Sequence, residues 1–392
     1  MTGGNRATGS IGGAAVIVGV GMTSSWRGSG RSAQSLAAES IGSAIADAGL
    51  DPALIDCILP YVPGVTSEEI SAAFGLERLR TVAFQPLGGA TAVASLKMAA
   101  MALTTGQANY VLTFIATPQV ANRSVFRVHS GVPGQQFRTQ LEHPYGWSRP
   151  SQWYAMLAQR HMHEFGTTKA QLATVALTMR EHAQLNPLAM TYGKSLTLDD
   201  YYSAPLISDP YQKFDCCLET DGSAAIILTT PERAKDLRRA PVTVSGVAEG
   251  HPASGDDISN RQDWFEIGLT HAAPEAFAMA GLRPSDVDVA MIYDCFTFEV
   301  IQQLEEAGFC ERGEGGAFVE SGAIGLGGSL PVNTHGGLLS EGHIAGMNHI
   351  VEAVRQLRGD AGARQIAEAR VAAVTGWGTL GDGSMAILEG AA

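Results

Sequence analysis

Charged residues and cysteine are both scarce in this chain of 392 residues. Only 17% of the residues are charged and 45% are apolar, which supplies material for buried cores and excludes a disordered chain. Lys and Arg total 26 against 39 Asp and Glu, a formal net charge of -13. Because an acidic chain repels the phosphate backbone, neither DNA nor RNA is expected as the main partner.

The chain also lacks a long apolar run. Its most apolar stretches, such as residues 110–116, are far shorter than the about 20 residues that a membrane-spanning helix needs. No membrane span is therefore expected. Residues 1–13 are rich in glycine and carry one arginine, unlike a secretory signal, and we expect a flexible tail that leads into a strand.

The few cysteines form no CxxC pair and no Cys/His cluster, so neither a disulfide framework nor a structural zinc site is indicated. They are Cys57, Cys216, Cys217, Cys295 and Cys310. His161 and His163 could suggest a metal ligand pair, but residues two apart on a helix point to different faces. We therefore predict no metal site, and a reducing cytoplasm fits the thiols best.

Three short patterns occur twice, in the same order, in the two halves of the chain. They are AGLDPALID at 48–56 and AGLRPSDVD at 280–288, the pairs Gly88-Gly89 and Gly336-Gly337, and DGSAAI at 221–226 and DGSMAI at 382–387. The stretch between the glycine pair and the Asp-Gly motif is much longer in the first half. The first half therefore carries an insertion, at about residues 118–210.

Each copy predicts the same local structure. An amphipathic helix with a glycine C-cap and a proline stop precedes a short apolar strand, at 57–62 and again at 289–293. Helical runs at 90–103 and 342–357 follow the glycine pairs. We expect an α/β fold of two duplicated halves, 14–235 and 240–392, packed through a shared helical layer.

The insertion has its own pattern. An aromatic-rich segment at 145–154 leads into two helices, the second of which starts with the capping-box residues Thr168 and Gln171 and runs to about Gln184. Long insertions with exposed aromatic side chains usually cover a site or a partner surface. A packed excursion with no role in binding is the alternative.

Residues 333–349 hold the densest group of polar side chains, NTHGGLLSEGHIAGMNH. Adjacent glycines allow a ligand to approach closely, and histidine is the side chain best suited to exchange a proton near neutral pH. His343 follows a glycine at an expected helix start and is the preferred candidate, whereas His349 is expected to be structural. Glycine-rich turns before helices could stabilise a developing negative charge, which places the site between the halves.

Residues 293–297, Tyr-Asp-Cys-Phe-Thr, lie where a buried strand ends and a helix begins near Thr297. Ligands gather at the strand ends of α/β sheets, so Tyr293 is a candidate. A core tyrosine with a satisfied hydroxyl is the alternative. Vicinal Cys216 and Cys217 are expected to pack, and the glycines at 313–316 lack the context of a dinucleotide fingerprint.

The duplicated halves, the Asp-Gly motifs and Gly336-Gly337 followed by Gly342-His343 resemble the thiolase superfamily over nearly the whole chain. The run at 293–296 stands where sterol-carrier-type thiolases have His-Asp-Cys-Phe. The resemblance implies a thiolase-like fold in a layered αβαβα arrangement. Two departures matter: the nucleophilic cysteine is expected at 88–91, which reads GGAT, and the second cysteine at 376–381, which reads GWGTLG. Without them the route through an acyl-enzyme is closed.

The segments 293–297, 303–306, 333–337 and 352–359 resemble the lipid-transfer-protein branch, and in particular the steroid side-chain aldolases. This implies retro-aldol cleavage of a β-hydroxyacyl-CoA to a ketone and a shorter acyl-CoA, with coenzyme A as part of the substrate and no other cofactor. Tyr293 and His343 are the implied catalytic residues, His343 standing where the family has a second tyrosine. The implied substrate-binding residues are Gly88, Gly89, Asp294, His335, Gly336 and Gly337.

The resemblance also implies a homodimer and a small OB-fold partner protein that carries a zinc ribbon. Two other functions stay open. One is a thiolase-like acyltransferase with a different nucleophile, for which Cys295 is the thiol near the predicted site. The other is a non-catalytic acyl-CoA-binding subunit of a complex.

Overall fold

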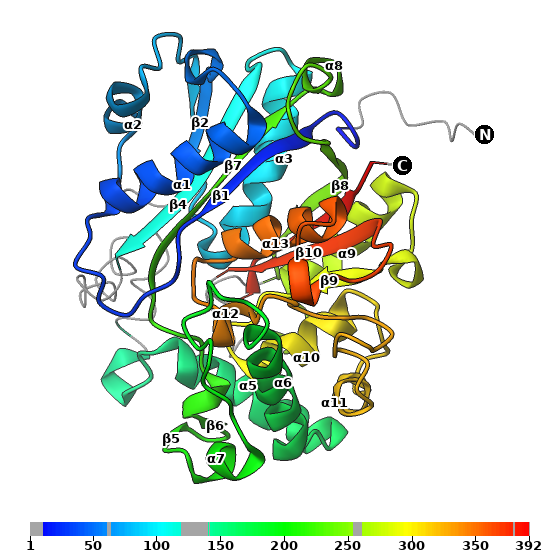
Figure 1. The fold of residues 1–392 in the computed structure, drawn as a ribbon. Coiled ribbons are helices and arrows are strands. Elements are labelled where there is room, and N and C mark those ends of the chain that lie inside the picture. Colours follow the sequence, from blue (N-terminus) through cyan, green and yellow to red (C-terminus); the bar gives the residue numbers. More distant parts are fainter. Residues whose placement is uncertain are drawn as a thin grey trace.

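The computed structural model describes residues 11–60, 64–118, 140, 142–253, 261–378 and 381–391. Nine strands form one continuous sheet in the order β3-β2-β4-β7-β1-β8-β11-β10-β9 (Figure 1). The strands of the first half are β1 (Val16–Met22), β2 (Cys57–Pro60), β3 (Thr81–Val82), β4 (Tyr110–Pro118) and β7 (Asp221–Thr229). Those of the second half are β8 (Val242–Gly250), β9 (Val289–Met291), β10 (Val371–Trp377) and β11 (Gly383–Glu389).

The two halves share one strand order, which confirms the predicted duplication. In each half the first strand pairs with the last, the last pairs with the strand that precedes it in this sheet, and that strand lies beside the second. Val332 forms a parallel bridge to Ala290 on the far side of β9, where the first half has β3. The halves join where β1 pairs antiparallel with β8, through Val16–Thr243 and Ile17–Val242.

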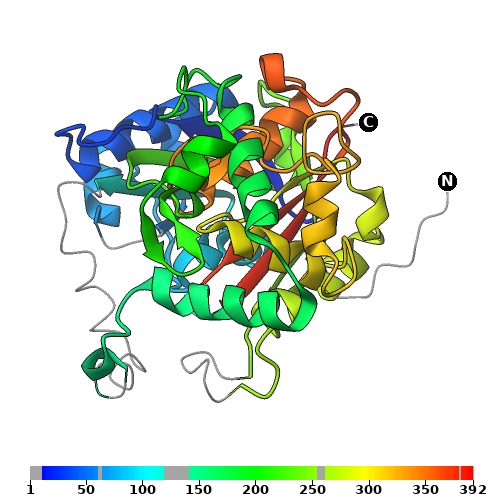
Figure 2. The same ribbon diagram turned by 90° about the horizontal axis from the view of Figure 1, so that it is seen from below.

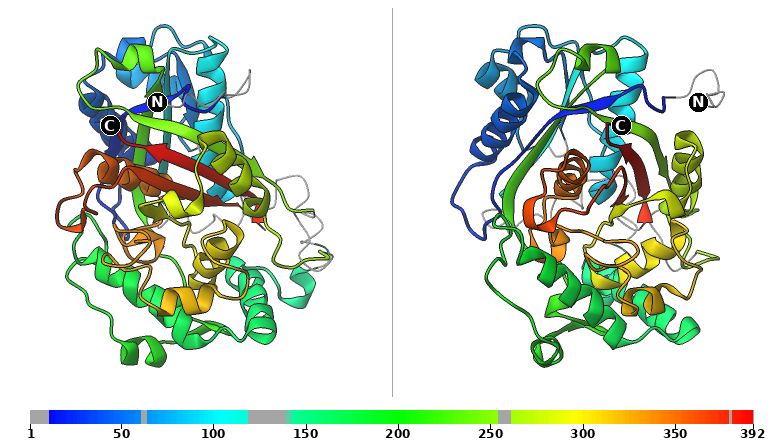
Figure 3. Two further views of the ribbon diagram at one scale, coloured as in Figure 1. Left: turned by 90° about the vertical axis from the view of Figure 1, so that its right-hand side faces the viewer. Right: turned by 45° about the vertical axis from the view of Figure 1, so that its right-hand side comes forward.

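Helices on both faces of these strands produce five layers. The outer face of the first half carries α1 (Ala33–Ala48) and α2 (Ser67–Phe74), and that of the second carries α9 (Gly268–Ala280) and α10 (Thr297–Glu306). Between the halves lie α3 (Thr91–Thr104) and α13 (Met347–Arg358), as Figure 3 shows. No helix in the described parts of the chain is both long and apolar enough to cross a membrane.

Three buried apolar clusters correspond to these layers. On β7, Ile226 and Leu228 face the cluster between the halves, whereas Ile227 faces the outer cluster under α1. On β11, Met385 and Ile387 face the outer cluster of the second half. Because successive side chains of a strand point to opposite faces, fully apolar strands are needed to fill a core on both sides.

The predicted insertion forms a cap on the second half. It contains α5 (Pro150–Phe165), α6 (Lys169–Ala183), α7 (Leu198–Ser203) and the hairpin β5 (Leu206–Ser208) and β6 (Tyr211–Gln212). The Thr168 and Gln171 capping box is present, as predicted. Helices α5 and α6 contact α10, and α6 also contacts α11 (Gly315–Glu320) and α12 (Gly337–Ser340). Figure 2 shows this green layer nearest the viewer. Residues 119–139 and 141 of the insertion lie outside the described residues.

Outside the insertion, the remaining short helix is α8 (Pro231–Ala234).

The repeated motifs adopt the same structure. Gly49 and Gly281 end α1 and α9 in the left-handed region, with φ of 66° and 72°, and a proline-containing 3-10 turn follows each. The strand predicted at 57–62 ends at Pro60, and residues 61–62 lie outside the described residues. The helix predicted at 90–103 is found at 91–104.

One helix starts later than predicted. The run at 342–357 becomes helical only at Met347, because Ala345 and Gly346 have φ of 45° and 81° and break the helical path. His343 therefore lies in the turn between α12 and α13. At the other end of the chain, Gly13 donates its N–H to the Val244 carbonyl at 2.7 Å, while residues 1–10 lie outside the described residues. The tail and the exact limits of the halves stay predictions.

Equivalent glycines bring a helix against the first strand of each half. A Cβ at Gly19 of β1 would lie 2.3 Å from the Ala44 carbonyl oxygen of α1. A Cβ at Gly246 of β8 would lie 2.0 Å from the Ala276 carbonyl oxygen of α9. In both halves the helix backbone thus rests directly on the strand, and any side chain would force the two apart.

We expect Gly19→Ala to lower the free energy of unfolding by about 1–3 kcal/mol, the usual cost of overpacking. Urea denaturation measures it. Gly327→Ala is the matched control, since Gly327 is exposed with open space around its Cβ position, and it should stay within about 0.5 kcal/mol of the wild type. Equal denaturation midpoints for Gly19→Ala and Gly327→Ala would contradict this account of the packing.

Candidate active site

Tyr293 follows β9, and its peptide groups are held from two sides. Its N–H donates to the Thr375 hydroxyl of β10 at 3.0 Å, and its carbonyl accepts from Gln303 Nε2 of α10 at 2.7 Å. The Thr375 hydroxyl donates in turn to Gln303 Oε1 at 2.6 Å. These three bonds close a ring, which fixes the direction in which the Tyr293 side chain leaves the sheet.

The phenol of Tyr293 lies between two glycines. A Cβ at Gly89 would come within 2.2 Å of the Tyr293 hydroxyl, and a Cβ at Gly346 would come within 3.1 Å of the ring. Gly88 and Gly89 open the 3-10 turn that continues into α3. The amino-terminal end of a helix favours negative charge, so this placement stabilises charge at the phenol oxygen.

His343 contacts Tyr293 directly. Its Nε2 lies 3.3 Å from the Tyr293 hydroxyl, and its backbone N–H donates to the Thr220 hydroxyl at 3.0 Å. Burial, with the nearby His349, lowers the pKa of His343 to about 4, so the imidazole is neutral at pH 7. Thr220 and Gly89 belong to the first half, whereas Tyr293 and His343 belong to the second. The two candidate side chains therefore meet between the halves, in the region where the sequence analysis expected the site.

The other predicted site residues lie behind this pair. The buried Asp294 carboxylate accepts from the Leu338 N–H at 2.8 Å and the Leu339 N–H at 3.2 Å, at the start of α12. A Cβ at Gly337 would lie 2.0 Å from Asp294 Oδ2. His335 and Gly336 are buried in the same turn. In this structure these residues hold the segment of Tyr293 against the turn that begins α12. Their contact with substrate stays a prediction.

The inserted segment forms a wall of the site through Tyr154 of α5. Trp377 Nε1 donates to the Tyr154 hydroxyl at 2.9 Å, and that hydroxyl donates to the Gly378 carbonyl at 3.3 Å. The Trp377 carbonyl would lie 2.4 Å from a Cβ at Gly89, so this wall reaches the phenol. Residues 379–380 of the same turn lie outside the described residues.

Several residues of this site were missed by the sequence interpretation. The glycine-rich spacing of 333–349 and 376–381 was the available signal for Gly346 and Trp377. Thr220 stands just before the Asp-Gly motif of the first half, and nothing in its sequence context marks it.

No cysteine offers a thiolate. Burial raises the pKa of Cys57, Cys216 and Cys310 to about 12, and it raises the pKa of Cys217 and Cys295 well above the ordinary value. These are all the cysteines of the chain. Each thiol is therefore protonated at neutral pH, and a protonated thiol is a poor nucleophile.

The described residues hold no group of three or more His, Cys, Asp or Glu side chains that could bind a metal ion. His161 is buried, with Nδ1 2.7 Å from the Thr167 hydroxyl and Nε2 3.0 Å from Glu305. His163 instead lines a surface groove. The two histidines face different ways, as their spacing predicted.

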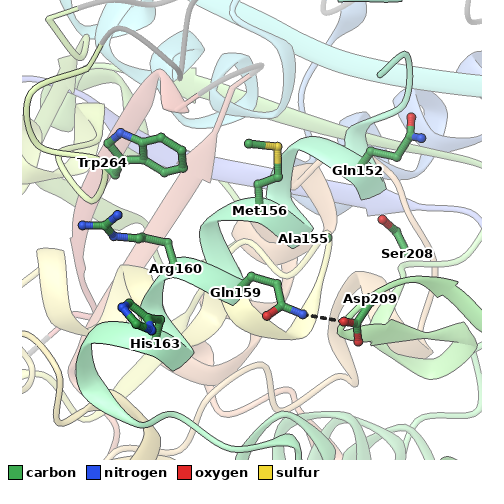
Figure 4. A pocket seen from close by; sticks show the side chains of 9 residues that line it. All are labelled: Gln152, Ala155, Met156, Gln159, Arg160, His163, Ser208, Asp209 and Trp264. Atoms are coloured by element: carbon green, nitrogen blue, oxygen red, sulfur yellow. Dashed lines mark hydrogen bonds between the residues drawn. The ribbon is translucent and has the colours of Figure 1, made fainter. Parts of the chain in front are cut away.

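That groove, of about 370 Å³, lies along the face of α5 that carries Met156, Gln159 and His163 (Figure 4). Gln159 Nε2 donates to Asp209 Oδ2 across it at 2.7 Å. Arg160 lies over the Trp264 ring, 5.9 Å from its centroid. Neither Tyr293 nor His343 lines this groove, so it is distinct from the candidate site.

Comparison with known proteins gives one consistent result. Residues 250–390 match the family "Thiolase C-terminal domain-like". The chain is 39% identical over 363 residues to the steroid side-chain-cleaving aldolase of Thermomonospora curvata, covering 88% of this chain and 91% of that one. It is 39% identical over 368 residues to the 17-hydroxy-3-oxo-4-pregnene-20-carboxyl-CoA lyase of Mycobacterium tuberculosis, covering 89% and 92%.

Among solved structures, the Ltp2-ChsH2(DUF35) aldolase superposes with a TM-score of 0.91 at 36% identity, covering 97% of this chain and 99% of that chain. The strand order of the two halves, the five layers and these matches confirm the predicted thiolase-like fold. The chain belongs to the family of steroid side-chain-cleaving aldolases within the thiolase superfamily.

Proposed function

We propose that the chain is a carbon-carbon lyase that cleaves a β-hydroxyacyl-CoA of the steroid side-chain type by a retro-aldol reaction. The observation that carries this proposal is the contact of the Tyr293 hydroxyl with His343 Nε2 at 3.3 Å, beside the amino-terminal end of α3. The phenol and the imidazole can transfer protons, and no thiolate is present to carry an acyl group. Such a site suits proton transfer without acyl transfer. The named activities of the two relatives support it.

The proposed step conserves its proton. Tyr293 takes the proton of the β-hydroxyl as the bond between Cα and Cβ breaks. The hydroxyl carbon becomes the ketone, and the electron pair of the broken bond stays on Cα as the enolate of the shorter acyl-CoA. The enolate then takes this proton at Cα from the Tyr293 phenol, which restores the phenol as a base and balances the proton removed from the hydroxyl.

His343 suits the second part of this reaction. A neutral imidazole can donate a hydrogen bond to the thioester oxygen as negative charge develops on it, without carrying a charge into a buried site. Gly89 leaves room for the Tyr293 phenol before the helix, and Gly88, which also has no side chain, would let the substrate approach this turn closely. An unperturbed tyrosine has a pKa of about 10, so the phenol needs the electropositive amino-terminal end of the helix to act as a base.

The substrate and partner are proposed at the level that the relatives support. The substrate is an acyl-CoA, in which coenzyme A is the carrier, and no other cofactor takes part. We place the enzyme in the cytoplasm. The partner is a small OB-fold protein with a zinc ribbon, supported by the solved aldolase whose name joins Ltp2 to ChsH2(DUF35). The inserted segment, which walls the site through Tyr154, gives such a partner a route to influence the site.

We further propose a homodimer that forms across β3. Among the described residues this strand is the edge of the first half, and Val82 in it and Phe84 just after it are 48% and 46% exposed. The equivalent edge of the second half, at Val332, is fully buried. An exposed apolar edge strand is a ready template for pairing with another chain.

Tyr293→Phe should lower the rate of ketone release from a tertiary β-hydroxyacyl-CoA by about 10² or more, because only the proton-transferring hydroxyl is lost. His343→Ala should lower it by about 10², the effect of removing one oxyanion donor. Both are measured with the authentic partner present, by a ketone assay.

Tyr202→Phe, on exposed α7, is the matched control and should keep the wild-type rate. Near-normal rates in folded Tyr293→Phe and His343→Ala would refute the assignment of these residues. If the wild type binds acyl-CoA tightly with its partner but releases no ketone, the non-catalytic subunit becomes the better function.

No acyl-enzyme should form, because all the thiols are protonated. Intact-mass analysis after incubation with acyl-CoA should show the mass of the unmodified chain. An adduct that disappears in Cys295→Ala would restore the acyltransferase function.

The double variant Val82→Lys/Phe84→Lys should sediment as a monomer at micromolar concentration, because two charges at the paired edge disfavour its burial. Leu206→Lys, a charge on an equally exposed residue of the inserted hairpin, should leave the dimer intact. A monomeric wild type would contradict the proposed dimer, and a dimeric double variant would place its interface elsewhere.

A further inference from the structure

The proposed chemistry leaves one histidine beside Tyr293 unused. The Tyr293 ring meets two imidazoles edge-on, His343 and His349, and each ring centroid is 6.2 Å away, with interplanar angles of 83° and 80°. His349 lies in the first turn of α13 and is fully buried. Its ring contact with the tyrosine is therefore shielded from solvent.

His349 bridges three segments of the second half. Its Nε2 lies 3.2 Å from Asp294 Oδ1, within ion-pair range although not well aligned as a hydrogen bond. Its Nδ1 lies 2.9 Å from His335 Nε2. Asp294 directly follows Tyr293, and His335 directly precedes the glycine pair. One imidazole therefore connects the tyrosine segment, the turn before α12 and the start of α13.

The contacts favour one arrangement of the protons. A carboxylate oxygen lies 3.2 Å from His349 Nε2, which favours the tautomer with the proton on Nε2 and a lone pair on Nδ1. His335 Nε2 must then donate to it. Burial and the neighbouring His349 hold the pKa of His335 well below its usual range, so His335 is neutral, as this pattern requires. Glu341 is 3.6 Å from the same nitrogen, too far to accept its proton, and is held by the amides of Asn186 and Asn348.

This arrangement has a cost to stability. His335 Nδ1 is buried and has no hydrogen-bond partner among the described residues. An unsatisfied buried acceptor destabilises the folded state, and an apolar side chain would avoid the loss. Buried polar groups kept at such a cost are candidates for a role in function.

We infer that His349 is a positioning residue for the proposed cleavage, which holds the Tyr293 phenol against His343 by tying Asp294 and His335 to the start of α13. The inference rests on the proposed function, because it assigns Tyr293 and His343 to the reaction. His349 acts through these residues and touches no substrate. Its loss should therefore reduce turnover more than substrate binding.

The test compares substitutions of two buried histidines. His349→Leu removes both polar contacts, whereas His349→Gln keeps one donor and one acceptor in the same place. His161→Leu is the matched control, since His161 is equally buried and also has two polar contacts, with Thr167 and Glu305. We expect His349→Leu to lower kcat by about 10- to 100-fold, as misplaced reacting groups do, with KM changed by less than about threefold. His349→Gln should recover most of kcat, and His161→Leu should lower Tm while kcat per folded enzyme stays near the wild-type value.

A second measurement does not depend on turnover. In protein labelled at the tyrosine Cζ with ¹³C, the Tyr293 resonance is assigned as the one that Tyr293→Phe removes. His349→Leu should shift this resonance and His161→Leu should not. Should His349→Leu fail to fold, His335→Leu is measured in the same way, and it should give a smaller loss of kcat with a shift of the same resonance.

The outcomes separate the inference from the function on which it rests. A wild type that releases no ketone with its partner refutes the proposed function, and the Cζ resonance still decides the positioning. An unshifted Tyr293 resonance in His349→Leu overturns the inference. So does a His349→Leu enzyme whose kcat equals that of His161→Leu, or whose KM alone rises.

Discussion

The close approach of Gly89 to the Tyr293 hydroxyl is the contact on which the rest of this site depends. A single methyl group at residue 89 would overlap the phenol, so the ring can occupy its place only because glycine stands in the 3-10 turn before α3. Thiolases are expected to carry their nucleophilic cysteine in this region. In this chain the space at the helix end is filled by a side chain from the other half. The phenol thus lies beside the amino-terminal end of a helix, which favours negative charge.

The duplicated architecture explains how two distant parts of the chain meet so accurately. The pairing of β1 with β8 joins the halves, and α3 and α13 fill the layer between them. A glycine precedes each helix, Gly89 before α3 and Gly346 before α13, and both glycines lie against Tyr293. The position of the site is therefore a property of the layer between the halves and does not depend on one flexible loop.

Much of this could be predicted from the sequence because the signals were local. The Gly49 and Gly281 caps, the Thr168 capping box and the repeated Asp-Gly motifs each specify their own structure within a few residues. The helix expected from residue 342 starts later, because Ala345 adopts a positive φ. Alanine rarely has a positive φ, so its residue type did not predict this break. The bond between Trp377 and Tyr154 joins residues more than two hundred positions apart. The bridge from His349 to Asp294 and His335 likewise depends on how three separate turns come together, so no spacing could reveal it.

The protonated state of every cysteine has a consequence for the conditions under which the proposed enzyme can work. Oxidants such as peroxide attack the thiolate form of cysteine, and an enzyme that depends on a thiolate loses activity as that group is oxidised. This chain breaks no bond through sulfur in the proposed mechanism, and its thiols are held in the unreactive form by burial. Its chemistry is therefore separated from the redox state of its surroundings, although it acts on thioesters of a thiol carrier.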